Sequence, residues 1–380
     1  MEKIEEFLAE REANNLLRVL EPLSFRGGGK IIHKGKEYID FSSNDYLGFS
    51  GHSLLKEASK QAIQEWGLSA CASRLLSGNL EIHHQLEEKV AIFKGKPQAL
   101  VFNSGYQANL GIISSLYKRG DVIFSDRLNH ASIIDGIILS KAKLLRFRHN
   151  DLNHLEFLLK KERTKFKQGL IITESVFSME GDKALLGEII EFKKRYNCQV
   201  YVDEAHAAGV FGSQGRGLAQ PEEVDLIMGT FSKALGSFGA YLACAKSIKD
   251  YLINSCRSFI YSTALPPAVI AANIAGLDLV DKEPHRRKIL LENADYLRNE
   301  LLKKGFKARG SSQIIPLIIG ESKRCVEISE ELKARGYWVF PIRPPTVPHD
   351  ESRLRFSLTY YHNREILGKL INDICQIFPV

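Results

Sequence analysis

The chain has 380 residues, of which 44% are hydrophobic and 26% charged, so it can bury a large core and form two or three domains. Its formal net charge of +7 is mild for this length and suits anionic substrates such as acyl carriers, but no basic and aromatic stripe indicates nucleic-acid binding. The six cysteines are dispersed without a Cys-x-x-Cys pair, which predicts reduced thiols in the cytoplasm. The sequence has no cluster of His and Cys at ligand spacing, so a metal site is not expected.

The N-terminal region has the pattern of a polar helix. Residues 1–21 alternate acids and bases with a helical period and lack the apolar centre of a signal peptide. No segment approaches the roughly 20 apolar residues that a membrane span requires. We therefore expect residues 1–40 to be a helical or extended segment of a protein that does not associate with membranes.

Short β-rich apolar runs alternate with longer helical patterns between about residues 98 and 245. The patterns at 152–161 and 187–196 are typical of helices between strands. The seven runs are Ala99–Asn103, Val122–Ser125, Leu144–Phe147, Leu170–Thr173, Val200–Asp203, Leu226–Thr230 and Ala240–Cys244. This alternation predicts an α/β fold with a mostly parallel seven-stranded sheet covered on both faces, and ligands of such sheets bind beyond the carboxyl ends of the strands.

A change in composition marks a domain boundary after the last of these strands. An apolar helix, residues 268–280, leads into the charged stretch 281–287. We therefore expect a large domain at 41–283 and a smaller C-terminal α+β domain at 284–380.

A proline-rich cluster lies within this smaller domain. Residues 341–348 contain four prolines, which is too many for a helix or a central strand. The cluster predicts a rigid loop on which Arg343 and Thr346 are fixed.

A lysine and an aspartate follow two of the predicted strands. Lys233 lies in the segment Thr230–Gly236, which reads Thr-Phe-Ser-Lys-Ala-Leu-Gly, and Asp203 begins the segment Asp-Glu-Ala-His. A lysine flanked by small and hydroxyl residues can form an imine with an aldehyde cofactor while its neighbours hold a phosphate. An acid at the end of another strand can keep a pyridine nitrogen protonated, which makes the ring an electron sink. The pair predicts a site for pyridoxal 5'-phosphate.

Asp-Glu-Ala-His also occurs in nucleic-acid helicases, where it holds magnesium beside a nucleotide. A nucleotide-driven protein of that class needs the phosphate loop G-x-x-x-x-G-K-[ST]. Neither Gly28–Ile31 nor Cys244–Ser247 completes this pattern. Residues 212–217 have the order G-x-x-G-x-G, which does not match a dinucleotide site and indicates a flexible active-site or surface loop.

Taken together, these segments resemble the α-oxoamine synthase family of fold-type-I pyridoxal-phosphate transferases over almost the whole chain. Besides the two motifs above, the resemblance is carried by Ser42–Gly48, His83–Glu87, Ser104–Asn109, Asp126–Ser132, Glu174–Asp182, Tyr261–Pro267 and Arg353–Arg355. Within the family, the first of these segments and the Ile342–Pro348 loop are most similar to members of the biotin pathway.

The resemblance implies a decarboxylative condensation of L-alanine with a pimeloyl group carried on coenzyme A or on acyl carrier protein. It also implies a homodimer with shared active sites, without nucleic-acid or membrane partners. Lys233, displaced from the cofactor by the amino acid, would remove the α-proton, and this requires surroundings that lower its pKa. The alternatives are glycine C-acetyl transfer from acetyl-CoA, another α-oxoamine synthase reaction, and a cofactor-binding scaffold without turnover.

The resemblance also assigns roles to cofactor-site residues. His130 would stack on the pyridine ring, and His206 and Ser178 would interact with the phenolic oxygen or its surroundings. The implied catalytic residues are Lys233, His130, Asp203 and His206. The implied cofactor-binding residues are Gly105, Tyr106, His130, Ser178, Asp203, His206, Thr230, Lys233 and Thr263. Of these, Gly105 and Tyr106 begin a helix that favours phosphate, Thr230 adds a hydroxyl donor, and Thr263 reaches the phosphate of the neighbouring subunit.

A second set of residues is implied in substrate binding. Arg355 would bind the amino-acid carboxylate, a task suited to a planar bidentate donor. The full set is Arg18, Asn44, Arg343, Thr346 and Arg355. Arg353, in contrast, is expected at the surface or at an interface.

Two segments depart from the family pattern. Ser69–Arg74 replaces a glycine-rich segment, which predicts a stiffer loop. Tyr360 and Tyr361 replace two alanines, and their phenol rings are expected to narrow or reshape the acyl channel.

Overall fold

The structure is a computed structural model that describes residues 2–379 and divides into two compact units. The first unit comprises the described residues up to Gly48, Ser178–Asp182, and the described residues from His285 onwards. The second unit comprises Phe49–Phe177 and Lys183–Pro284. The described parts of the predicted segments 1–40 and 284–380, which the sequence-based division separates, are thus almost entirely grouped in one unit.

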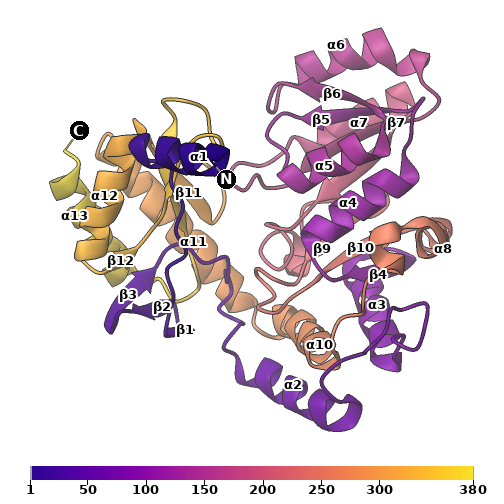
Figure 1. Cartoon of the computed structure of the whole chain (residues 1–380), viewed down its shortest axis with the longest axis horizontal. Helices are drawn as coiled ribbons and strands as arrows, with labels where there is room; N and C mark the ends of the chain where they lie inside the picture. The colour runs from indigo at the N-terminus through magenta and orange to yellow at the C-terminus, as the bar shows by residue number, and fades with distance from the viewer. Residues whose placement is uncertain (1, 380) are drawn as a thin grey trace. The chain divides into compact units, whose positions relative to one another are not determined.

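The second unit is built on a seven-stranded sheet (Figure 1). Its strands are β4 (Gln98–Phe102), β5 (Val122–Asp126), β6 (Lys143–Phe147), β7 (Gly169–Glu174), β8 (Gln199–Asp203), β9 (Leu226–Thr230) and β10 (Ala240–Cys244). Their spatial order is β4-β10-β9-β8-β7-β5-β6, and only β10 runs antiparallel to its neighbours. Each predicted run forms one strand, so the mostly parallel sheet is confirmed.

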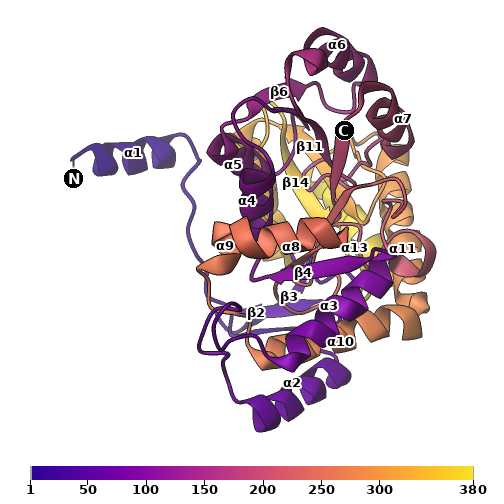
Figure 2. The ribbon, with the colours of Figure 1, turned by 90° about the vertical axis from the view of Figure 1, so that its right-hand side faces the viewer.

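Helices cover both faces of this sheet because its strands are apolar on both sides. They are α2 (Ser53–Trp66), α3 (Glu81–Lys94), α4 (Gly105–Leu116), α5 (Ala131–Ser140), α6 (Leu152–Glu162), α7 (Leu186–Tyr196), α8 (Lys246–Ser255), α9 (Arg257–Ile260) and α10 (Pro267–Lys282), with 3-10 turns η1 (Arg163–Lys165) and η2 (Ser213–Gly215). Helices α4, α5, α8 and α9 share one apolar core with the sheet, and α6 and α7 share the other. Helix α10 packs against α2 and α3 (Figure 2). The three predicted helices are observed as α6, α7 and α10.

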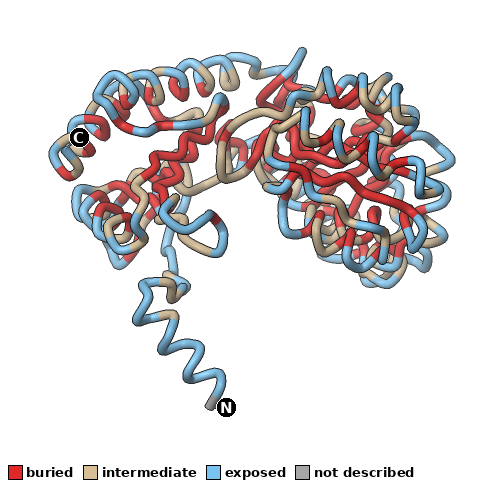
Figure 3. The backbone as a smooth tube through the Cα atoms, turned by 90° about the horizontal axis from the view of Figure 1, so that it is seen from above, coloured by how far each residue is buried: buried red, intermediate tan, exposed pale blue. Residues whose placement is uncertain are grey.

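The first unit contains two small sheets. One has the order β1-β2-β3-β12 and the other β11-β14-β13. The strands are β1 (Phe25–Gly27), β2 (Lys30–His33), β3 (Lys36–Asp40), β11 (Ile314–Gly320), β12 (Tyr337–Trp338), β13 (Pro341–Ile342) and β14 (Ser352–Ser357). The helices are α1 (Glu2–Ala13), α11 (Pro284–Lys303), α12 (Ser322–Ala334) and α13 (Arg364–Ile377). Strands β11 and β14 are mostly buried, whereas the helix beside the N-terminus, α1, is exposed (Figure 3).

The proline-rich cluster of the first unit forms an edge strand followed by a turn. Its first two residues make β13, which lies beside β14 at the edge of its sheet, and edge strands tolerate proline. The Thr346 N–H then donates to the Arg343 carbonyl over 3.1 Å, so both predicted substrate residues lie on an ordered turn.

Arg353, on β14, is fully buried. Its Nη1 lies 2.6 Å from Glu180 Oε1 and its Nη2 lies 2.7 Å from Glu351 Oε2. The expected surface position is therefore wrong, because two carboxylates compensate for the loss of water around the guanidinium.

In the part of the chain that the structure describes, no helix is both long and apolar enough to span a bilayer.

Candidate active site

Lys233 lies in a tight turn just beyond the carboxyl end of β9. The Gly236 N–H donates to the Lys233 carbonyl over 3.0 Å, which closes the turn. Gly236 has a φ of 68°, and a Cβ there would lie 2.5 Å from the backbone of Phe49, so only glycine fits. The turn places Lys233 Nζ 3.0 Å from His206 Nε2. Two residues predicted to act together are thus in direct contact.

Asp203 is the last residue of β8, and its buried carboxylate is held by two donors. Asn109 Nδ2 donates to Oδ2 over 2.9 Å, and the Ala205 N–H donates to Oδ1 over 2.9 Å. Hydrogen bonds of this kind favour the charged form of a carboxyl group. Asp203 can therefore provide the fixed negative charge that a protonated pyridine nitrogen requires.

The beginning of α4 and the end of β9 form a cradle for an anion. Ser104 caps α4 by accepting from the Gln107 N–H over 3.2 Å. The first N–H groups of a helix have no partner within the helix, and its dipole favours negative charge there. A Cβ at Gly105 would lie 2.8 Å from Thr230 Cγ2, so the backbone of α4 comes close to Thr230 only because residue 105 is glycine.

Thr230 supplies the observation that tests this cradle. Its hydroxyl is buried, and it has no hydrogen-bond partner among residues 2–379. Buried polar groups are nearly always hydrogen-bonded, so an unpaired hydroxyl beside a helix N-terminus indicates a bound acceptor such as phosphate. Together with Lys233 and Asp203, the cradle matches the aldehyde, ring nitrogen and phosphate of pyridoxal 5'-phosphate. The residues present therefore fit this cofactor.

His130 and Tyr106 lie at the starts of adjacent helices. His130 caps α5, and its ring centroid is 6.3 Å from that of Tyr106 in an edge-on arrangement. Both residues are exposed overall. Part of the His130 imidazole is nevertheless buried, which lowers the pKa of His130, and the negative charge of Asp203 opposes this change. The ring is therefore neutral near pH 7. The Tyr106 hydroxyl donates to Asp135, which holds this side chain on the surface of α4 and α5.

Glu174 is a second acid beside Asp203. It ends β7, where it lies opposite Asp203 in the parallel ladder. Its side chain is buried, and its Oε1 has no hydrogen-bond partner within residues 2–379. Burial, followed by repulsion from Asp203, raises the pKa of Glu174 to about 8. Glu174 is therefore neutral at pH 7.

Glu204, the next residue of the Asp-Glu-Ala-His segment, has a structural role. It is fully buried and forms an ion pair with Lys94, which is also buried. Glu204 Oε1 accepts from the N–H groups of Leu218 and Ala219. The loop that contains residues 212–217 is thus tied to the end of β8, so it is less free than the glycine pattern predicts.

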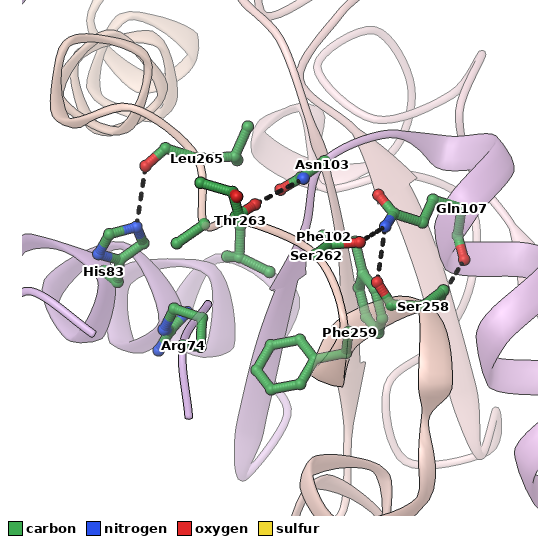
Figure 4. A pocket seen from close by; sticks show the side chains of 12 residues that line it. Arg74, His83, Phe102, Asn103, Gln107, Ser258, Phe259, Ser262, Thr263 and Leu265 are labelled. Atoms are coloured by element: carbon green, nitrogen blue, oxygen red, sulfur yellow. Dashed lines mark hydrogen bonds between the residues drawn. The ribbon is translucent and has the colours of Figure 1, made fainter. Parts of the chain in front are cut away.

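Thr263 lies at the rim of a small pocket near the start of α4. Figure 4 shows Asn103 and Gln107 among its lining residues, with Asn103 Nδ2 donating to the Thr263 carbonyl over 2.9 Å. Thr263 itself is exposed. Its backbone is therefore held in place. Its contact with a neighbouring subunit stays a prediction.

Three of the predicted residues meet in the first unit. Arg355 Nε donates to the Ser178 carbonyl over 2.6 Å, and its Nη2 donates to Asn44 Oδ1 over 3.2 Å. Asn44 Oδ1 also accepts from the Tyr46 hydroxyl over 3.1 Å. The guanidinium is therefore oriented by the fold, as a carboxylate-binding arginine must be. Ser178 belongs to the first unit, whereas Lys233 belongs to the second.

The other predicted substrate residues form a second cluster in the first unit. Arg18 Nη2 donates to Thr346 Oγ1 over 3.1 Å, and Arg343 Nη1 donates to the Asn15 carbonyl. Burial, with a smaller contribution from the positive charge of Arg18, lowers the pKa of Arg343. Two neighbouring cations beside a hydroxyl are suited to binding an anionic group.

Tyr361, one of the two residues that depart from the family pattern, packs inside the first unit. A Cβ at Gly48 would lie 2.3 Å from its ring, and its hydroxyl donates to the Gly48 carbonyl over 3.2 Å. The tyrosine therefore occupies space that this glycine leaves open. Its effect on an acyl channel stays a prediction.

The sequence reasoning assigned no role to four residues of this site. Asn109 and Ser132 contact Asp203 and His130, Tyr201 contacts Asn109, and Glu174 lies beside Asp203. Three of the four are within segments already recognised, namely Ser104–Asn109, Asp126–Ser132 and Glu174–Asp182. Membership of those segments was the available signal, but it does not show which side chains meet.

Comparisons with known proteins agree with this chemistry. The family model for class I and II aminotransferases matches residues 36–374. The 8-amino-7-oxononanoate synthase of Geotalea daltonii is 45% identical over 384 residues, which covers 99% of this chain and 98% of the relative. The solved structure of 8-amino-7-oxononanoate synthase from Francisella tularensis has a TM-score of 0.78 at 30% identity and covers 89% of this chain and 97% of that one. A serine palmitoyltransferase from S. paucimobilis with a bound PLP-myriocin aldimine has a TM-score of 0.92 at 28% identity and covers 99% and 97%.

Proposed function

Because the chain belongs to the class I and II aminotransferase family, we propose that it is a pyridoxal-phosphate-dependent acyltransferase with 8-amino-7-oxononanoate synthase activity. The reaction joins L-alanine to a pimeloyl thioester, releases the thiol and carbon dioxide, and forms an intermediate of biotin biosynthesis. Relatives with 44–45% identity over nearly the whole chain support this substrate pair over glycine and acetyl-CoA.

The single structural observation that carries the proposal is the set of groups around the ends of β8 and β9. Lys233 is next to His206, Asp203 is held by two donors, and the buried Thr230 hydroxyl has no partner in the described residues. Lys233 would hold the cofactor aldehyde, Asp203 the ring nitrogen, and Thr230 with the start of α4 the phosphate. When bound, the cofactor supplies an electron sink for the negative charge that develops on the α-carbon of the amino acid.

The residues of the chain then control the protons. Lys233 Nζ, once released as a neutral amine, takes the α-proton of alanine as general base. His206 Nε2 lies within hydrogen-bond distance of this amine, so it can accept from the ammonium form and donate to the neutral form. His206 is therefore placed to stabilise Lys233 in both protonation states. His130 is proposed to lie against the cofactor ring.

The substrate roles belong to the first unit. Arg355, oriented by Ser178 and Asn44, is proposed to bind the alanine carboxylate. Arg18, Arg343 and Thr346 are proposed to bind the acyl substrate, whose carrier and terminal carboxylate are both anionic. Their clustering supports this assignment.

The proposal includes a homodimer and a cytoplasmic location. The exposed Thr263 is proposed to reach the phosphate in the partner subunit, and Ile4, Phe7 and Leu8 of α1 are exposed apolar residues that a second copy would cover. All six cysteines are unpaired, which supports a reducing compartment.

Thiol release by the cofactor-loaded protein tests the activity. L-alanine would be supplied with pimeloyl-CoA or pimeloyl-acyl carrier protein, and glycine with acetyl-CoA in a parallel reaction. L-serine with palmitoyl-CoA would test the activity named for the structural relatives. We expect the pimeloyl reactions to be fastest and to yield amino-oxononanoate by mass spectrometry. A faster reaction with glycine or serine would move the function to another member of the family.

Lys233→Ala provides the control for the cofactor. We expect this variant to lose the absorbance of the lysine-linked cofactor and all thiol release. An unchanged spectrum in the variant would remove the basis for the proposed chemistry.

A further inference from the structure

Asn109, on α4, connects residues of β8 and α5 in the second unit. Side chains two apart on a strand share a face, so Tyr201 and Asp203 of β8 point the same way, and Tyr201 belongs to the core that includes α4 and α5. Asn109 lies on α4 and Ser132 on α5. All four side chains are buried. Helix α4 therefore places one amide among polar groups that have no access to water.

The chemistry of Asp203 determines which way this amide points. An ionised carboxylate only accepts hydrogen bonds, so the atom 2.9 Å from Asp203 Oδ2 is the amide nitrogen. The amide oxygen then accepts from the Tyr201 hydroxyl over 2.6 Å. The second hydrogen of Asn109 Nδ2 goes to Ser132 Oγ over 3.0 Å. Every polar atom of the Asn109 side chain is thereby used.

This orientation continues to His130. Because Ser132 Oγ accepts from Asn109, its own hydrogen is available to His130 Nδ1, which lies 2.8 Å away. The backbone N–H of Ser132 also points at Nδ1, over 3.3 Å, as part of the cap of α5. Two donors face one nitrogen, so Nδ1 acts as an acceptor. The neutral ring then carries its proton on Nε2.

We propose that Asn109 is a positioning residue that links the carboxylate of Asp203 to the tautomer of His130 through Ser132. The negative charge of Asp203 orients the Asn109 amide, the amide orients the Ser132 hydroxyl, and the hydroxyl keeps the His130 proton on Nε2. One buried asparagine thus links the negative charge of Asp203 to the position of the proton on the His130 ring.

The tautomer can be measured directly in the cofactor-free protein. Histidine side chains labelled with ¹⁵N would be observed by NMR at a pH where His130 is neutral, and His130→Gln would identify its signals among the 11 histidines. We expect Nδ1 to be unprotonated and Nε2 to be protonated in the wild type. A wild-type ring protonated on Nδ1 would overturn the proposal.

Two variants separate the steps in this series of hydrogen bonds from Asp203 to His130. Asn109→Ala removes the donor to both Asp203 and Ser132, whereas Ser132→Ala removes the hydroxyl between Asn109 and His130 and leaves the Asn109 donor to Asp203 in place. One hydrogen bond is worth about fivefold in an equilibrium, so we expect the ratio of Nε2–H to Nδ1–H forms of His130 to fall by about fivefold in each variant. If Asn109→Ala does not fold, Ser132→Ala still tests the step to His130 and Tyr201→Phe tests the orientation of the amide. An unchanged ratio in the variants that fold would contradict the proposal.

Asn293→Ala is the matched control. Asn293 is a buried asparagine of the first unit whose Nδ2 donates to the His362 carbonyl over 2.7 Å. Its loss should lower stability without changing the His130 tautomer. A comparable change of tautomer in this variant would show that general destabilisation, rather than Asn109, is responsible.

Turnover distinguishes this inference from the proposed function. With the synthase substrates, we expect Asn109→Ala to lower kcat about tenfold or more, because Asp203 loses a charge-assisted hydrogen bond, with less than threefold change in the KM for L-alanine. This kinetic arm rests on the proposed function, whereas the NMR arm does not. Inactive wild-type protein with the expected tautomers would therefore refute the function and support the positioning role.

Discussion

Replacing Thr230 by valine should have opposite effects on stability and on cofactor binding. The Thr230 hydroxyl is buried without a partner among residues 2–379, and such a group destabilises a folded protein by roughly 1–3 kcal/mol. Valine has nearly the same shape but no hydroxyl. We therefore expect Thr230→Val to raise the free energy of unfolding of the cofactor-free protein by about 1 kcal/mol, measured by urea denaturation.

The same substitution should weaken binding of pyridoxal 5'-phosphate. A hydrogen bond to a charged group contributes about 1.5–3 kcal/mol, and 2 kcal/mol corresponds to about a 30-fold increase in Kd. The Kd would be measured by fluorescence titration of the cofactor-free protein. Pyridoxal, which lacks the phosphate, should bind the wild type and the variant within about twofold of each other.

Thr173 provides a matched control for this prediction. It is a buried threonine on β7, which β8 separates from β9 in the same sheet, but its hydroxyl donates to the Glu174 carbonyl over 3.2 Å. Thr173→Val should therefore destabilise the protein by about 1 kcal/mol, opposite in sign to Thr230→Val. A Kd for the phosphate form that changes less than threefold in Thr230→Val, or an equal change for pyridoxal, would refute the assignment of Thr230 to the phosphate.

Three further substitutions test other parts of the site. The folded protein keeps a proton on Glu174 between the ordinary pKa near 4.5 and the raised pKa of about 8, so its free energy of unfolding falls as pH rises through that range. Glu174→Gln should therefore reduce the loss of unfolding free energy between pH 6 and pH 8. An unchanged loss would contradict the raised pKa. Glu204→Gln should destabilise the protein by about 3 kcal/mol or more in urea denaturation because it leaves the buried Lys94 unpaired, and a stability equal to wild type would show that the pair is not needed. Arg355→Lys should raise the KM for L-alanine at least tenfold with a smaller effect on the pimeloyl thioester, since an ammonium cannot keep the guanidinium geometry; an unaltered KM would remove Arg355 from the carboxylate site.

Much of the second unit could be predicted from the sequence because its signals are local. Each apolar run between residues 98 and 245 became a strand of the main sheet, since a continuous run of that length is suited to a strand buried on both faces. Lys233 and Asp203 follow two of these strands, and parallel strands bring their carboxyl ends to one edge of the sheet. The positions of these two residues therefore followed from the order of elements alone.

Hydrogen-bond partners that are distant in the chain were decided only by the tertiary structure. Asn109 meets Asp203 across 94 positions, and no pattern around either residue encodes that contact. Arg353 was expected at the surface or at an interface because arginine is mostly exposed, yet the fold supplies two carboxylates that make its burial possible. Local periodicity determines which segments become helices and strands. Strand order and helix packing determine which buried polar groups meet, and this is why the Thr230 hydroxyl and the chain from Asp203 to His130 became visible only in three dimensions.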